Sequence, residues 1–146
     1  GYTAENEANK VNVLGFTELV DWGYRYFDHQ GSGHLVAITS FAGLFGFRSS
    51  PAYTAAKGYQ LNYMEALRQK AHRSKKPVFV TDIRPGFVDT DISKELDTFW
   101  VASPEKAARQ IERAIRRKRK MVYVSKRWRI MALVINSLPS WLRGRL

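Results

Sequence analysis

The stretch "HLVAITS", residues 34–40, decides the fold class of this chain. It is a short apolar run rich in β-branched residues, which is typical of a strand buried on both faces. Two similar runs follow along the chain, "PVFVTDI" at 77–83 and "MVYV" at 121–124. The sequence therefore predicts three buried strands, separated by segments long enough to hold helices.

The segments between these strands have helical spacing. Apolar residues recur at helical intervals from residue 5 to about 29, and "GSG" at 31–33 ends that helix. Ser50 and Pro51 predict the capped start of a second helix that runs to about Arg73, and Ser103 and Pro104 predict the start of a third. A fourth helix is expected to end near Ser137. The predicted apolar positions are Tyr59, Leu61, Tyr63, Met64 and Leu67 in the second helix and Ala107, Ala108, Ile111 and Ile115 in the third.

Helices and strands thus alternate, which is the order of a parallel sheet with helical crossovers. We predict an α/β fold, a Rossmann-type parallel sheet with flanking helices. Three strands are few for a sheet that must be covered on both faces, so the sequence is expected to lack N-terminal strands. Residues 1–125 are predicted to form the catalytic part of such a domain, and residues 126–146 a basic amphipathic tail.

The composition restricts the chemistry. The chain has no cysteine, which excludes disulfides, thiolate catalysis and cysteine-bound zinc, and fits a reducing, cytoplasmic location. The three histidines, His29, His34 and His72, have no metal-ligand spacing, so we expect no metal site.

The positive charge is concentrated near the C-terminus. Residues 105–146 hold 13 of the 24 basic residues and two of the 13 acidic ones, which accounts for the whole net charge of +11. Three interpretations remain open: a solvated basic face with a packed helix, peripheral contact with an anionic membrane, or nucleic-acid binding. No recognition motif supports nucleic acid, so we expect none as a partner. The apolar run "IMALVI", flanked by arginines and by Trp128 and Trp141, suits an interfacial helix but is too short to span a bilayer.

Tyr53 and Lys57 form a Y-x-x-x-K motif in "SSPAYTAAKGYQ", residues 49–60. Positions four apart share one helix face, so the ammonium can approach the phenol. Either the pair merely shares an amphipathic face, or the cation favours the phenolate and makes the tyrosine a general acid near neutral pH.

Further polar residues gather at the same predicted edge of the sheet. Ser40 closes the first strand at its carboxyl end, where open α/β sheets bind ligands. The segment "IRPGFVDT", with Thr90, follows the second strand at the same edge. Asn12 lies in the otherwise apolar "VNVLG", where a buried amide needs a partner.

Together these segments resemble the second half of a short-chain dehydrogenase/reductase. The matching segments cover most of residues 10–125 in that family's order: "VNVLGF", "GHLVAITSFAG", "YTAAK", "DIRPGFVDT" and "SPEKAARQI".

The resemblance implies a role for each of four residues. Tyr53 would exchange a proton with the reacting oxygen, and Lys57 would lower the tyrosine pKa and hold the nicotinamide ribose. Ser40 would orient the substrate carbonyl by a hydrogen bond. Asn12 would hold a water that links Lys57 to solvent. On the alternative interpretation, Ser40 is only a strand-end hydroxyl and Asn12 only a buried helix amide.

The resemblance also implies a cofactor, NAD or NADP. The Pro85–Gly86 turn and Val88 would line the nicotinamide pocket, and Thr90 would meet the carboxamide or a phosphate.

Residues 91–102 would then form a lid over a small carbonyl or alcohol substrate. Phe99 and Trp100 are candidates for substrate contact, and packing in the core is the alternative interpretation for both.

The family's glycine-rich phosphate loop, T-G-x-x-x-G-x-G, is absent from this sequence. We therefore expect the present residues alone to be inactive, as a fragment of an NAD(P)-dependent oxidoreductase. The resemblance further implies dimers or tetramers formed through the helices at 5–29 and 51–73. The rival hypothesis is a non-catalytic α/β module whose basic tail anchors it to a membrane or a protein partner.

Overall fold

The chain begins with one long helical run that changes its pitch in the middle. The computed structural model describes residues 1–86, 102–125 and 127–139. Helix α1 (Tyr2–Asn9) continues into η1 (Lys10–Gly15), a wider π-helical turn, and then into α2 (Phe16–Gln30). Gly31 ends the run with a φ of 86°, a left-handed conformation that glycine adopts without steric cost.

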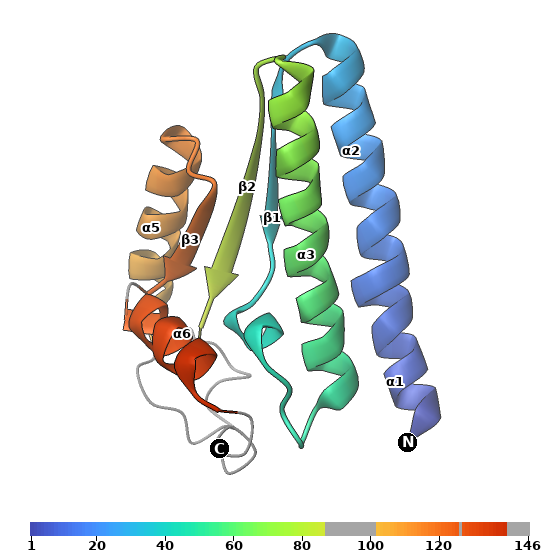
Figure 1. Cartoon of the computed structure of the whole chain (residues 1–146), viewed down its shortest axis with the longest axis vertical. Helices are drawn as coiled ribbons and strands as arrows, with labels where there is room; N and C mark the ends of the chain where they lie inside the picture. Colours follow the sequence, from blue (N-terminus) through green and yellow to red (C-terminus); the bar gives the residue numbers. More distant parts are fainter. Residues whose placement is uncertain (87–101, 126, 140–146) are drawn as a thin grey trace.

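The described residues form a three-stranded parallel sheet. Its strands are β1 (Gly33–Ile38), β2 (Val78–Pro85) and β3 (Met121–Val124), in the order β1-β2-β3. In the register, Ile38 lies opposite Ile83, which lies opposite Val122. All three strands therefore end at one edge of the sheet, the lower edge in Figure 1.

Helices cover both faces of the sheet (Figure 1). On one face, α2 and α3 (Pro51–Ser74) pack through a core around Tyr24, Met64 and Val80. On the other face, α5 (Pro104–Arg116) packs on Ile83 and Val124. These two apolar clusters hold the sheet between two helical layers, as a Rossmann-type fold requires.

A third cluster lies at the carboxyl edge of the sheet. The short 3-10 helix η2 (Phe41–Leu44) follows β1, and α6 (Arg127–Ser137) follows β3. Phe41 packs against Trp128 with ring centroids 4.6 Å apart, and Ala132 completes the cluster. The first part of the C-terminal segment therefore folds onto the edge where the strands end.

The structure confirms the predicted α/β fold and its three strands. The predicted helices correspond to the α1–α2 run, α3, α5 and α6, and the side chain of Ser103 caps α5 by accepting a hydrogen bond from the Lys106 amide, as expected. The cap predicted for Ser50 is wrong, because its side chain makes no capping hydrogen bond. Ala108 was predicted to face inward but is exposed, whereas Ala114 is buried. For Trp128 the sequence left a packed helix and an interfacial helix open, and in the structure its side chain is buried, at 3% exposed.

Over the described ranges, none of the helices combines the length and the apolar character needed to cross a bilayer.

Candidate active site

Tyr53 and Lys57 lie on the first two turns of α3, at the carboxyl edge of the sheet. The Lys57 ammonium lies 5.7 Å from the centroid of the Tyr53 ring, within the range of a cation–π contact. The Tyr53 side chain is 42% exposed, so its phenol is open to solvent or to a ligand. The helical spacing predicted from the sequence therefore brings the two side chains together.

Lys57 is partly buried and is connected to a second helix. Burial lowers the pKa of its ammonium below the ordinary value for lysine. Its Nζ donates a hydrogen bond of 3.1 Å to Gln60 Oε1, and Gln60 Nε2 donates one of 2.8 Å to the main-chain carbonyl of Asn12. The Asn12 side chain donates to the carbonyl of Ala8 at 3.0 Å. Asn12 thus reaches Lys57 through its main chain and the Gln60 amide.

Ser40 lies between β1 and η2, where it caps the 3-10 turn. Its Oγ accepts a hydrogen bond of 3.1 Å from the Ala42 amide, which leaves the hydroxyl proton available for donation. Gly43 presses this turn against α3: a Cβ built there would lie 2.6 Å from the Lys57 carbonyl carbon and 2.8 Å from the Gly58 amide. Only a glycine lets η2 approach α3 this closely, so Gly43 sets the distance between Ser40 and Lys57.

The Pro85–Gly86 turn ends β2 at the same edge. A Cβ on Gly86 would lie 2.2 Å from Nε1 of Trp128, so the indole of α6 packs directly on this turn. The remaining predicted site residues, Val88, Thr90, Phe99 and Trp100, lie outside the described residues.

A buried network of polar side chains lies next to this edge of the sheet. Asp82, which is fully buried, accepts hydrogen bonds from Thr39 Oγ1 at 2.6 Å and from Arg84 Nε at 2.7 Å. Arg84 also donates to the Tyr123 hydroxyl at 3.2 Å. All three strands or their ends therefore contribute to one network, which fixes their relative positions next to the site.

Sequence reasoning missed Gln60 and Gly43, and it left the position of Trp128 undecided. Gln60 could have been found, because it follows Ala56 by four residues and precedes Met64 by four, and both of those are buried. A polar residue in that series needs hydrogen-bond partners. Gly43 gave no local signal, since the close approach joins segments that are distant along the chain.

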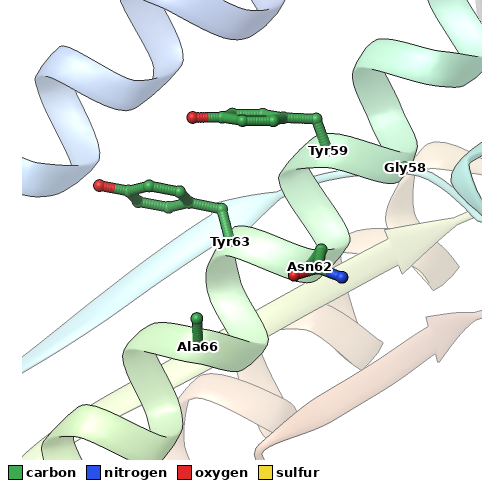
Figure 2. A pocket seen from close by; sticks show the side chains of 5 residues that line it. All are labelled: Gly58, Tyr59, Asn62, Tyr63 and Ala66. Atoms are coloured by element: carbon green, nitrogen blue, oxygen red, sulfur yellow. The ribbon is translucent and has the colours of Figure 1, made fainter.

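No group of three or more potential metal ligands occurs among residues 1–86, 102–125 and 127–139. A shallow depression of about 460 Å³ lies away from the polar edge, on the outer side of α3. Figure 2 shows its lining, with the rings of Tyr59 and Tyr63 side by side and pointing toward the N-terminal helical run. Tyr59 shares a hydrogen bond of 2.7 Å with Thr17.

Comparison with known proteins identifies the family. Residues 4–99 match the family model described as short chain dehydrogenase. The chain is 39% identical over 64 residues to the oxidoreductase SadH of Mycobacterium tuberculosis, covering 44% of this chain and 23% of SadH. It is 33% identical over 86 residues to the human 3-oxoacyl-[acyl-carrier-protein] reductase, covering 59% of this chain and 35% of that protein.

The structure of the chain is also similar to solved structures of short chain dehydrogenases. The whole chain superposes on 60% of a short chain dehydrogenase from Burkholderia cenocepacia, solved in complex with NADP, with a TM-score of 0.79 and 19% identity. The chain thus spans less than two thirds of the length of each of these relatives. With the Y-x-x-x-K pair at the carboxyl edge of a parallel sheet, the match over residues 4–99 shows that this chain belongs to the short-chain dehydrogenase family.

Proposed function

We propose that the full-length protein catalyses reversible hydride transfer between NAD or NADP and a small carbonyl or secondary-alcohol substrate. The observation that carries the proposal is the position of the Lys57 ammonium over the exposed Tyr53 ring, at the edge where parallel sheets bind ligands. Membership of the short-chain dehydrogenase family supports an oxidoreductase activity. The reaction, the cofactor and the roles of single residues are our inference.

In this proposal Tyr53 donates its phenolic proton to the substrate oxygen during reduction and recovers it during oxidation. The Lys57 ammonium is held close to the Tyr53 ring and is partly shielded from water, where it would stabilise the negative charge that develops as the proton leaves. Ser40 donates its hydroxyl proton to the same substrate oxygen, while one lone pair of its oxygen accepts the hydrogen bond from the Ala42 amide.

The donor set fits a nicotinamide cofactor. An ammonium has three protons, and Lys57 uses one of them for Gln60, so two remain for the hydroxyls of a ribose. The Pro85–Gly86 turn would line the nicotinamide pocket. Val88 and Thr90, which lie outside the described residues, are proposed to complete it. The nicotinamide supplies or accepts the hydride when it is bound.

Asn12 is proposed to hold a water that connects Lys57 with solvent. Its main-chain carbonyl accepts from Gln60, and a carbonyl oxygen has a second lone pair for such a water. Phe99 and Trp100 are proposed to contact an apolar substrate.

Substitution of Tyr53 tests the function. Tyr53→Phe removes the proton and keeps the ring, so NADH or NADPH oxidation should fall at least 100-fold with a 3-oxoacyl thioester, an aromatic ketone or a steroid ketone as substrate. Tyr59→Phe, on the same helix and away from the polar edge, is the matched control. Equal activity of the two variants would contradict the proposal and favour the non-catalytic module.

Residues 1–146 alone are proposed to be inactive and to bind NAD(P) weakly, because the sequence contains no glycine-rich phosphate loop. Calorimetric titration of these residues with NADPH measures this directly. Micromolar affinity would contradict this proposal, because it would show that residues 1–146 bind NADPH without the glycine-rich phosphate loop.

We also propose that the protein forms homo-oligomers through the outer faces of α2 and α3. Large apolar side chains are exposed there, with Trp22 at 64%, Leu19 at 67% and Tyr59 at 37%. The depression that Tyr59 and Tyr63 help to line (Figure 2) could receive such a side chain of a second copy. Trp22→Glu should reduce the mass measured by analytical ultracentrifugation, whereas an unchanged mass would exclude this face.

We also propose that the protein is cytoplasmic and contacts an anionic membrane peripherally through α6. Its inner side packs through Trp128, while Ile130 and Leu133 are exposed on the outer side. Helical geometry places Arg127 and Arg129 on the two flanks of this outer stripe, where arginines can reach lipid phosphates. Leu133→Asp should abolish flotation with phosphatidylserine vesicles, and equal flotation of the variant would remove the membrane from the proposal.

A further inference from the structure

Gln60 is a buried amide whose two ends are both engaged beside Lys57. Its side chain is 3% exposed, although it lies on a helix whose next residue but one, Asn62, faces solvent. Gln60 Oε1 accepts the hydrogen bond of 3.1 Å from Lys57 Nζ, and Nε2 donates that of 2.8 Å to the Asn12 carbonyl. The amide therefore connects the ammonium on α3 with the main chain of η1.

The chemistry of the two partners allows one orientation of this amide. An ammonium can only donate, so it must face the amide oxygen, and a main-chain carbonyl can only accept, so it must face the NH₂ group. The reversed amide would place donor against donor and acceptor against acceptor. The bridge therefore holds Lys57 in a defined direction rather than offering it one of several acceptors.

The wider turn of η1 supplies the free acceptor. In a regular α-helix the Phe16 amide would donate to the carbonyl of Asn12, four residues earlier. In η1 the Phe16 amide is directed instead to the carbonyls of Val11 and Val13. The Asn12 carbonyl can then accept from another helix, and Gln60 is the donor that it meets. Single π-helical turns occur often at functional sites, and here the turn has a definite consequence for a neighbouring helix.

We propose that Gln60 is a positioning residue for the active site: its amide ties the Lys57 ammonium to the Asn12 carbonyl, so that η1 fixes where the ammonium points. The lysine stem has four rotatable carbon–carbon bonds, and a hydrogen bond to an amide that is itself held by η1 restricts them. The bridge itself stands on the hydrogen bonds. Its role in the reaction rests on the proposed function of Tyr53 and Lys57.

Two substitutions at Gln60 should move the titration of Lys57 in opposite directions. Gln60→Leu keeps the buried volume and removes the acceptor, so the charged form of Lys57 loses a hydrogen bond and its pKa falls. Gln60→Glu places a carboxylate beside the ammonium and raises the pKa of Lys57. Gln69→Leu and Gln69→Glu repeat both changes at an exposed position of the same helix and should leave Lys57 unchanged.

The titration can be measured without a substrate. The full-length protein is labelled competitively with acetic anhydride over a pH series, and peptide mass spectrometry gives the midpoint for Lys57, with the exposed Lys70 as internal reference. Opposite shifts for the two Gln60 variants, absent from both Gln69 variants, support the bridge. A residue that only fills space would give no such pair of shifts. Midpoints that move no further than in the Gln69 variants would overturn the proposal.

Activity then separates the bridge from the function. If Gln60→Leu shifts the Lys57 midpoint and also lowers kcat at least tenfold with little change in KM, Gln60 positions a catalytic lysine. If the midpoint shifts while kcat of an active enzyme is unchanged, the positioning role in the reaction is refuted. If Tyr53→Phe leaves the wild-type activity intact, the proposed function fails instead, and the labelling result still decides on the bridge.

Discussion

Replacing Gly43 with alanine should displace the Ser40 turn from α3. The added Cβ would lie 2.6 Å from the carbonyl carbon and 2.7 Å from the carbonyl oxygen of Lys57, both main-chain atoms in a helix that cannot rotate away. Ordinary contact begins at 3.4 Å, so η2 and α3 must separate by about 0.8 Å. Ser40 belongs to this turn, because the Gly43 amide donates to its carbonyl at 3.3 Å.

A shift of this size has two measurable consequences. Insertion of a methyl group into a packed contact costs about 1–3 kcal/mol of stability, which chemical denaturation resolves. A misplacement of about 1 Å between reacting groups can reduce the rate about 100-fold, so we expect the proposed hydride transfer to fall between tenfold and 100-fold. The loss should appear in kcat, because the displaced Ser40 hydroxyl is proposed to act on the substrate oxygen as charge develops there.

Two other glycines serve as graded controls in the same assays. Gly46 is exposed and a Cβ there would meet no atom within 4 Å, so Gly46→Ala should preserve activity and stability. Gly58→Ala would place its Cβ 3.2 Å from the Gly43 carbonyl oxygen, a milder clash, and alanine favours the helix by about 1 kcal/mol. Its effect on activity should therefore lie between those of the other two variants. Activity of Gly43→Ala equal to that of Gly46→Ala would refute the idea that this approach sets the site.

Three further predictions concern buried charge. Burial lowers the pKa of Lys57, so the unfolded state binds more protons between the folded and the ordinary pKa, and stability rises with pH there. Lys57→Met should remove this rise, which urea unfolding measures at pH values below the ordinary lysine pKa of about 10.4. Arg84→Met leaves the fully buried Asp82 carboxylate without its cation and should lower the free energy of unfolding by about 3–5 kcal/mol; a loss below that of an exposed substitution would contradict the network. Burial also lowers the pKa of His34, so stability should fall as pH falls through the ordinary histidine range. His34→Gln, which keeps a donor for the Thr81 hydroxyl, should flatten this acid loss in thermal unfolding.

The spacing of apolar residues in the sequence was sufficient to predict the parallel sheet and the helices that cover it. Each strand lies within two residues of the predicted one, because runs such as "MVYV" and "HLVAIT" have few alternatives to burial. The Tyr53–Lys57 contact was predictable for a similar reason, since both residues belong to one helix.

Features that depend on two distant segments were not predictable in this way. The apolar residues of the N-terminal run recur at ordinary helical intervals and give no sign of the π-helical turn. The turn matters through the hydrogen bond between Gln60 and the Asn12 carbonyl, which joins two segments distant in sequence. The inward position of Trp128 depends on the shape of the Gly86 turn that receives it. The hydrophobicity of Trp128 is equally compatible with contact with a lipid surface and with packing in a core.

The contact of Trp128 with Gly86 gives the molecule a built-in optical reporter. The indole belongs to the C-terminal helix and rests on the turn that we assign to the nicotinamide pocket. Its fluorescence emission should therefore respond both to nucleotide binding at the turn and to membrane binding by α6. One fluorescence signal, followed with Trp128→Phe as the blank, would thus show whether events at the lipid surface reach the cofactor pocket.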